Sequence, residues 1–497
     1  MDEGYSTWTG LLYVFNLIVG TGVLTLPHAF VQAGWVFGIL LLSALAFTSY
    51  MAVTFVIEAM SRANAVKMTL RLRHLQKSKA AFLKQIQGDS DVSVSGDEEG
   101  DHSRIPPETS PLVPNEYIDK FPAAPRSLFS VDTKVEMVEM AELFFPPWGK
   151  VFFFINFCLY LCGDLTVYAA AVGKSLVDVS CMTTSINSTH PDNELCWEGA
   201  TITRRGAYAI FLLLFVLTLG PFAFFNVQKT KYIQMFTTLM RTLAFSVMIV
   251  LSVQRIIDPT QDHGSPPVVR PAGMPALFGA CIYSFMCHHS LPALITPIKD
   301  KSKLSRLLSF DFILILTFYF ILILTSIFAF PNIEQLLTLN FRPDFNTKLD
   351  LEIIDYFLML FPVLTLSASF PIIAITLRYN LQAASVGEDG PWVVRRLVLP
   401  TIAVTVPIIV ALLFTNIETI VGINGSYAGA GIQYVIPVFL LLRSRALTPE
   451  ALKNEVNPHQ SPFSSPIWPR ALLLWAVCCV IFVSVNLADK FLNVSVF

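Results

Sequence analysis

Two apolar stretches of this 497-residue chain are interrupted by residues that disfavour a helix, near 18–22 and near 284–290. The first interruption contains Gly20 and Gly22 and is followed by Pro27. Glycine costs about 1 kcal/mol in a helix interior relative to alanine, and proline removes a backbone donor. Unwinding there would free backbone N–H groups at the start of a half-helix, where the positive end of the helix dipole favours an anion. The pattern therefore predicts a site for a carboxylate such as that of an amino acid.

Such interruptions are informative because a helix in lipid must satisfy its own backbone groups. Non-helical backbone at that depth is found only beside a cavity or inside protein, and paired interruptions in two chain halves indicate a transporter's substrate site. Carbonyl groups freed at the end of the first half-helix would suit an ammonium group or a sodium ion. The alternative is a close helix crossing that requires small residues. The candidate substrate-binding residues are Val19, Gly20, Thr21, Gly22, Ser284, Phe285 and His288.

Ionisable and hydroxyl side chains inside the apolar stretches are candidates for ion coupling. The histidine pair 288–289 titrates near physiological pH and could carry a proton, although a structural histidine is the commoner case. Asp164 could accept a proton, and Arg241 could act as a fixed cation where sodium would otherwise lie; both could equally pack against partners on other helices. Ser367 and Ser369 could ligate sodium, or could simply bond to their own helix.

The composition places these candidates in a membrane protein with several spans. Hydrophobic residues make up 54% of the chain and charged residues 14%, and the mean hydropathy is +0.59, all beyond the usual range of a soluble domain. A net charge of −2 and the lack of a binding motif argue against a nucleic-acid partner. Zinc-ligand spacing and paired catalytic carboxylates are also missing from the sequence. We therefore expect no cofactor, no enzymatic activity and no metal other than a coupling sodium ion.

Eleven stretches are long and apolar enough to cross roughly 30 Å of hydrocarbon as helices. They lie near 9–31, 35–59, 150–178, 206–225, 232–254, 274–297, 308–330, 352–376, 397–415, 420–442 and 469–488. Lysine and arginine are concentrated in the connections after even-numbered spans, which places the N-terminus in the cytosol and the C-terminus on the other side. The predicted fold class is an all-α polytopic membrane protein with eleven transmembrane helices.

The connection after the third span carries signs of the lumenal or extracellular side. Residues 181–205 contain a glycosylation sequon at Asn187 and the only two cysteines outside the spans, Cys181 and Cys196. Glycosylation and disulfides both require a non-cytosolic environment. We expect a disulfide between these cysteines and glycosylation of Asn187; two free thiols and an unused sequon are the alternative.

The long connection after the second span divides the chain into three parts, residues 1–60, 61–130 and 131–497. The first and last parts carry the spans, and the middle part is a cytosolic loop. Its basic start, 62–84, could lie on the membrane surface as an amphipathic helix or extend the second span into water. The stretch 88–130 is rich in Ser, Pro, Asp and Glu, which predicts disorder. A short amphipathic helix is expected within 131–148.

Motifs around both interruptions resemble those of the amino acid/auxin permease family. The stretch 16–27 resembles the family's opening motif, and 285–292 resembles its sixth-span motif. More closely, the segments 225–232 and 429–437 resemble the orphan transmembrane protein 104 group. The resemblance covers nearly the whole chain apart from 61–130.

This resemblance implies a five-plus-five inverted repeat of spans 1–5 and 6–10, with an eleventh helix outside it. It also implies that helices 1 and 6 are unwound at the substrate and that the protein works by alternating access. In sodium-coupled relatives, an asparagine at the position of Asn16 helps to hold the ion, and a hydroxyl stands at the position of Ser369. The chain departs from those relatives at His289 and Ser290 and carries Arg241, so the resemblance leaves the coupling ion open between sodium and a proton.

The sequence predicts a secondary active transporter that moves a small amino acid or similar zwitterion through a plasma or endolysosomal membrane, with the substrate, a coupling ion and membrane lipid as its partners. The ion-coupling candidates are Asn16, Ser367, Ser369, Asp164 and Arg241. The rival is a non-transporting amino acid sensor that signals through the 61–130 loop. An intramembrane enzyme and a G-protein-coupled receptor fit the pattern less well.

Overall fold

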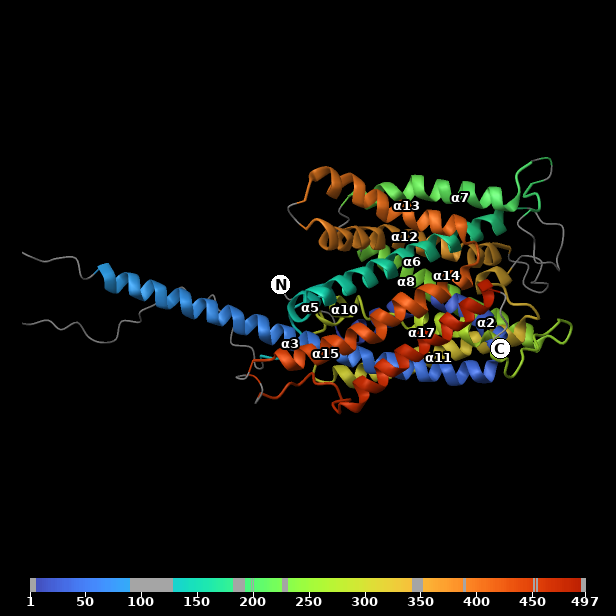
Figure 1. Ribbon diagram of the computed structural model, residues 1–497. Coiled ribbons are helices and arrows are strands. Elements are labelled where there is room, and N and C mark those ends of the chain that lie inside the picture. Colours follow the sequence, from blue (N-terminus) through green and yellow to red (C-terminus); the bar gives the residue numbers. More distant parts are fainter. Residues whose placement is uncertain are drawn as a thin grey trace, which may run out of the picture.

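A bundle of long helices makes up the computed structural model of this protein (Figure 1). The model describes residues 6–89, 128–181, 193–197, 199, 201–225, 231–341, 352–387, 390–449, 452 and 455–492. In this part of the chain no strand occurs, and a single β-bridge joins Leu195 and Thr203. Apolar side chains between the helices form one large buried cluster, while many others face outward, as they do in a lipid-exposed bundle. The predicted all-α, polytopic class is confirmed.

The helices follow one another along the chain with short connections. In order they are α1 (Thr7–Ile18), α2 (Gly22–Ala33), α3 (Trp35–Asp89), α5 (Met137–Phe144), α6 (Pro147–Ser180), α7 (Arg204–Leu219), α8 (Lys231–Ile257), α9 (Met274–Ser284), α10 (Leu291–Ile295), α11 (Leu304–Ala329), α12 (Glu352–Ser385), α13 (Leu399–Leu413), α14 (Ile417–Asn424), α15 (Ile436–Leu447) and α17 (Ile467–Leu492). Two π-helical turns, Gly425–Gly429 and Gly431–Val435, connect α14 to α15.

Ten of the eleven predicted spans coincide with membrane-length apolar segments among the described residues. Nine are single stretches of helix, and the tenth is the bent pair formed by α1 and α2. The sixth predicted span, 274–297, consists instead of α9 and α10, which have 11 and 5 residues. Each is too short to cross the bilayer alone, because a crossing needs about 20 residues. The eleven-helix count and the inverted repeat remain predictions.

Both predicted interruptions are breaks in the helices. α1 ends at Ile18 and α2 begins at Gly22, and their axes differ by 52°. α9 ends at Ser284, and α10 begins at Leu291. The residues between each pair lack regular helical hydrogen bonding, so backbone groups become available at the centre of the bundle.

The second span runs much further than its apolar sequence. α3 is a single 55-residue helix that leaves the bundle at one end and continues to Asp89 (Figure 1). This matches the extension of the second span rather than a helix lying on the membrane surface. The predicted amphipathic helix within 131–148 is α5, which packs at the same end of the bundle (Figure 1). The predicted disorder of 88–130 lies almost wholly outside the described residues.

The connection after α6 is closed by the predicted disulfide. Cys181 and Cys196 are bonded, with their Cα atoms 4.5 Å apart. Thr203 then caps the start of α7 by accepting a hydrogen bond from the backbone N–H of Gly206. Asn187, the predicted glycosylation site, lies outside the described residues.

A buried carboxylate ties α3 to α15 at the end of the bundle from which α3 projects. The side chain of Glu58 is fully buried and accepts two hydrogen bonds from Arg445, each 2.8 Å long. Arg62 Nε lies 3.0 Å from the same carboxylate, and the backbone N–H of Ser461 donates to it at 3.0 Å. These contacts bring the loop before α17 against α3.

We expect Glu58→Ala to lower the thermal stability of the purified protein strongly. The substitution leaves Arg445 without its buried partner, and breaking a buried ion pair typically costs about 3–5 kcal/mol. Glu139→Ala is the matched control, because Glu139 pairs with Lys67 at a half-exposed site, where an ion pair is worth about 1 kcal/mol or less. A melting curve in detergent measures both variants. Equal shifts in the two melting temperatures would refute the role of Glu58.

Candidate substrate site

The ends of the two half-helices meet at one tyrosine. The hydroxyl of Tyr319, on α11, is 3.0 Å from the carbonyl oxygen of Ile18 and 2.9 Å from that of Ser284. These residues are the last of α1 and of α9, so Tyr319 joins the C-terminal ends of both half-helices. Its side chain is fully buried. The two breaks, far apart in sequence, therefore form one polar centre inside the bundle.

The two glycines of the first break have different surroundings. A Cβ atom at Gly22 would lie 2.8 Å from the Cα atom of Ser284, so glycine is needed there for the close approach of the two breaks. A Cβ atom at Gly20 would have no heavy atom closer than 3.9 Å. The close-crossing explanation therefore accounts for Gly22 but not for Gly20.

Backbone N–H groups at the start of α2 are available to an anion. Thr21 is the N-cap residue of α2, but its side chain makes no capping hydrogen bond. Its hydroxyl instead lies 3.5 Å from the hydroxyl of Tyr283. α2 is 12 residues long, so the first turn carries the positive end of a helix dipole beside Val19 and Gly20. This geometry can bind a carboxylate.

A chain of hydroxyl groups leads from the first break to the buried carboxylate of α6. The hydroxyl of Tyr283, on α9, donates a hydrogen bond of 2.5 Å to Asp164. The same hydroxyl lies beside Thr21. Asp164 is only 5% exposed. Thr21, Tyr283 and Asp164 thus form a polar path from the first break to α6.

The arginine of α8 reaches the same centre. Arg241 donates a hydrogen bond from its guanidinium to the carbonyl oxygen of Asn16, in the last turn of α1. A cation therefore already lies against one of the carbonyl groups that a sodium ion would use.

The sequence candidates for sodium ligation bond to their own helices. The Asn16 amide donates to the carbonyl oxygen of Leu12 at 2.8 Å, and the Ser369 hydroxyl donates to that of Thr365 at 3.1 Å. Ser367, two residues before Ser369 on α12, is half-buried. α12 packs chiefly against α6, α8 and α13. In this conformation the Asn16 and Ser369 side chains are therefore bonded within α1 and α12 rather than to a common ligand.

The histidine pair is divided between two faces of the second break. His288 is fully buried, and its Nε2 lies 3.3 Å from the carbonyl oxygen of Ser49 on α3. His289 instead packs its ring near Tyr160 of α6, with 5.5 Å between ring centroids. Phe285 is buried against the rings of α11, 5.3 Å from that of Tyr319. Of the two histidines, His289 faces a cavity.

That cavity reaches the second break from the end of the bundle where α5 lies. Its volume is about 470 Å³, and it is bordered by α5, α6 and α12. His289 and Ser290, of the second break, line it together with the polar side chains of Glu136 and Tyr379. The second break therefore borders a cavity.

Two residues of the site, and one further buried carboxylate outside it, were not predicted from the sequence. Tyr283 and Tyr319 carry no sequence signal, because tyrosine is common in apolar helices. Asp311, on α11, is 2% exposed, and one of its carboxylate oxygens makes no hydrogen bond within the described part of the chain. A search for acidic residues inside the predicted spans would have found Asp311, as it found Asp164.

Comparisons with known proteins find relatives over nearly the whole chain. The sequence matches the family model described as transmembrane amino acid transporter protein over residues 3–70 and 133–483, so the unmatched segment nearly coincides with the predicted 61–130 loop. Transmembrane protein 104 of Homo sapiens is 44% identical over 98% of this chain and 97% of its own length. Its homologues in Drosophila melanogaster and Dictyostelium discoideum are 42% and 33% identical, and each alignment covers at least 96% of both proteins.

Proposed function

We propose, since the chain belongs to the transmembrane amino acid transporter family, that it moves a small amino acid or similar zwitterion across a membrane by alternating access. The observation that carries this proposal is the meeting of two broken helices at Tyr319. Broken helices at the middle of a span expose backbone groups that only a polar ligand or protein partners can satisfy. A family of non-enzymatic transporters is consistent with the lack of catalytic pairs in the sequence.

The two ends of a zwitterion fit opposite ends of the first break. The carboxylate would accept hydrogen bonds from the N–H groups at the start of α2, near Thr21 and Gly22. The ammonium group would approach the carbonyl groups of Ile18 and Ser284, because the single O–H of Tyr319 can donate to only one of them at a time and a carbonyl oxygen has two lone pairs. Phe285 and the second break would then bound the side-chain pocket.

A proton suits the coupling role better than sodium. Arg241 already binds the carbonyl group of Asn16, and the side chains of Asn16 and Ser369 bond to their own helices. Asp164, linked to Thr21 through Tyr283, is the group we assign to proton binding. Transport would then depend on the pH gradient and not on sodium.

Uptake into proteoliposomes tests the function. The purified full-length protein is reconstituted, and a panel of labelled amino acids is offered with sodium and pH gradients imposed separately. We expect uptake of at least one small amino acid, driven by an inward proton gradient and unchanged when potassium replaces sodium. Uptake driven only by sodium would refute the coupling assignment, and no uptake of any amino acid under either gradient would refute transport.

We expect Arg241→Gln to reduce proton-driven uptake about tenfold, because it removes the fixed positive charge at the end of α1. Each tenfold change corresponds to about 1.4 kcal/mol. Arg241→Lys is the matched variant; it keeps the charge, although lysine cannot reproduce the planar donor geometry, and should retain part of the activity. Initial uptake rates at equal protein content measure both. Wild-type rates in the glutamine variant would contradict the role of Arg241.

A sensor that binds an amino acid without transporting it is the second candidate. The observation that favours it is the length of α3, which projects from the bundle and leads toward the connection that the family model does not match (Figure 1). Amino acid binding without uptake, together with signalling that is lost on deletion of residues 90–127, would support it over the transporter.

A further inference from the structure

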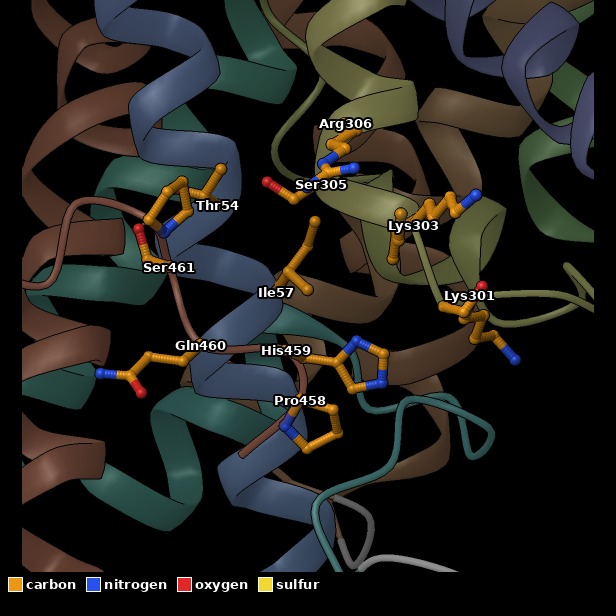
Figure 2. A pocket seen from close by; sticks show the side chains of 13 residues that line it. Thr54, Ile57, Lys301, Lys303, Ser305, Arg306, Pro458, His459, Gln460 and Ser461 are labelled. Carbon is orange, nitrogen blue, oxygen red and sulfur yellow. The ribbon is translucent and has the colours of Figure 1, made fainter. Parts of the chain in front are cut away.

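A second cavity, of about 370 Å³, lies away from the broken helices. It opens at the end of the bundle from which α3 projects, between α3, the first turn of α11 and the loop before α17 (Figure 2). Its volume falls within the roughly 300–1,000 Å³ of small-molecule sites. Nothing in the proposed transport cycle uses it.

The lining of this cavity carries positive charge. Lys301, Lys303 and Arg306 lie on one side, and His459 lies on the other (Figure 2). No aspartate or glutamate is among the residues that line it. The side chain of Lys301 is only 10% exposed; its Nζ lies 2.7 Å from a carboxylate oxygen of Asp132, which is 71% exposed and outside the cavity. An ammonium group has three donors, so Lys301 retains donors beyond this ion pair.

The histidine adds a neutral donor. Burial lowers the pKa of His459; Asp132 opposes this shift and Lys301 adds to it. A lowered pKa favours the neutral imidazole, which offers one N–H group. Because Lys301 is paired with Asp132, Lys303 and Arg306 supply most of the positive charge of the cavity.

The wall that holds His459 is fixed by hydrogen bonds. The backbone N–H of Ser461 donates to Glu58 at 3.0 Å, and the Asn457 side chain donates to the hydroxyl of Ser61 at 2.8 Å. The backbone N–H of His459 donates to Asn457 at 2.9 Å. The loop before α17 is thus held against α3, and the cavity is formed before any ligand binds.

The cavity lies at the ends of membrane-crossing helices. Its α11 residues belong to the first turn of a 26-residue apolar helix, and its α3 residues, Thr54 and Ile57, lie in a helix that also crosses. Lipid phosphates lie at this depth, and basic cavities between such helices bind phosphorylated headgroups. The N-terminus of α11 has no side-chain cap at Lys303, so its dipole adds to the attraction.

We propose that this cavity binds a phosphate group, and that the phosphate belongs to the headgroup of an anionic lipid. The phosphate would lie between Lys303 and Arg306 on one side and His459 on the other. This proposal does not rest on transport, because the site shares no residue with the broken helices.

Binding to the purified full-length protein in detergent tests the proposal. The probes are dioctanoyl phosphatidylinositol 4-phosphate, dioctanoyl phosphatidylcholine, inositol 1,4-bisphosphate and inorganic phosphate, and native mass spectrometry or thermophoresis gives the dissociation constants. We expect the phosphoinositide to bind at least tenfold more tightly than phosphatidylcholine. Lys303→Gln with Arg306→Gln should weaken that binding at least tenfold.

The matched control is Lys299→Gln with Arg470→Gln. It removes the same charge from exposed residues that do not line the cavity, and it should leave the affinity within about twofold. Equal losses in both double variants would overturn the site, as would equal affinity for the two lipids. Tight binding of inositol bisphosphate or inorganic phosphate that the Lys303–Arg306 variant abolishes, without binding of the lipid, would support a phosphate site but overturn its assignment to lipid.

Discussion

Gly20→Ala is expected to abolish most amino acid uptake while leaving the fold intact. A methyl group at this position has no heavy atom within 3.9 Å, so the helices need not move to accept it. It would occupy the space through which a carboxylate approaches the N–H groups at the start of α2. We expect initial uptake to fall tenfold or more, which corresponds to about 1.4 kcal/mol or more of lost binding.

The neighbouring glycine gives a less clear answer. A side chain at Gly22 would meet the backbone of Ser284, so loss of activity there could reflect a displaced helix. Gly422→Ala is the better control for Gly20→Ala, because Gly422 lies in α14 and an added Cβ there would have no heavy atom within 4 Å. The two variants should express and melt alike but differ in uptake. Wild-type uptake in Gly20→Ala would show that the first break does not bind the carboxylate.

Asp164→Asn is expected to remove proton-driven accumulation. Asparagine can still accept the hydrogen bond from Tyr283, but it cannot bind and release a proton. We expect uptake against a gradient to fall at least about tenfold, with exchange of labelled for unlabelled substrate less affected, since exchange needs no net proton movement. Counterflow and gradient-driven uptake in the same proteoliposomes separate the two effects.

Asp311→Asn is the matched control for this experiment. Asp311 is also a buried carboxylate, but it lies on α11, and within the described residues no hydrogen bond joins it to Thr21 or Tyr283. It should retain proton-driven accumulation. If Asp311→Asn lost accumulation and Asp164→Asn kept it, the proton site would have to move to α11.

The breaks could be predicted from the sequence because their causes are local. Gly20, Gly22 and the prolines beside each break weaken the helix through their own backbone chemistry. The disulfide was equally predictable, because Cys181 and Cys196 are the only cysteines outside the apolar stretches. Features that depend on a single residue type at one position can be predicted without a structure.

The partners across the bundle could not be predicted in this way. The contact of Arg241 with Asn16 joins residues 225 positions apart, and that of Tyr283 with Asp164 joins residues 119 apart. Which side chains meet depends on how α1, α6, α8 and α9 pack, and helix packing is only weakly encoded in any single span. The charged residues can therefore be identified from the sequence, but their partners cannot.

The histidine pair shows the same limit. The sequence makes His288 and His289 equal candidates, and the turn between α9 and α10 directs one toward α3 and the other toward the cavity beside α6. The hydropathy pattern places the end of the second span near residue 59, but α3 continues as a helix to Asp89. Helix propensity does not require apolar side chains. Assigning a role to either histidine needs the fold.

A cryo-electron microscopy map of the protein with a bound amino acid tests the central claim most directly. The amino acid is the one that gives the highest uptake, and the matching map without it serves as the reference. We predict ligand density between the two broken helices, with its carboxylate within hydrogen-bond distance of the backbone N–H groups of Thr21 and Gly22. Continuous helices through 18–22 and 284–290, or ligand density only outside the breaks, would contradict the account.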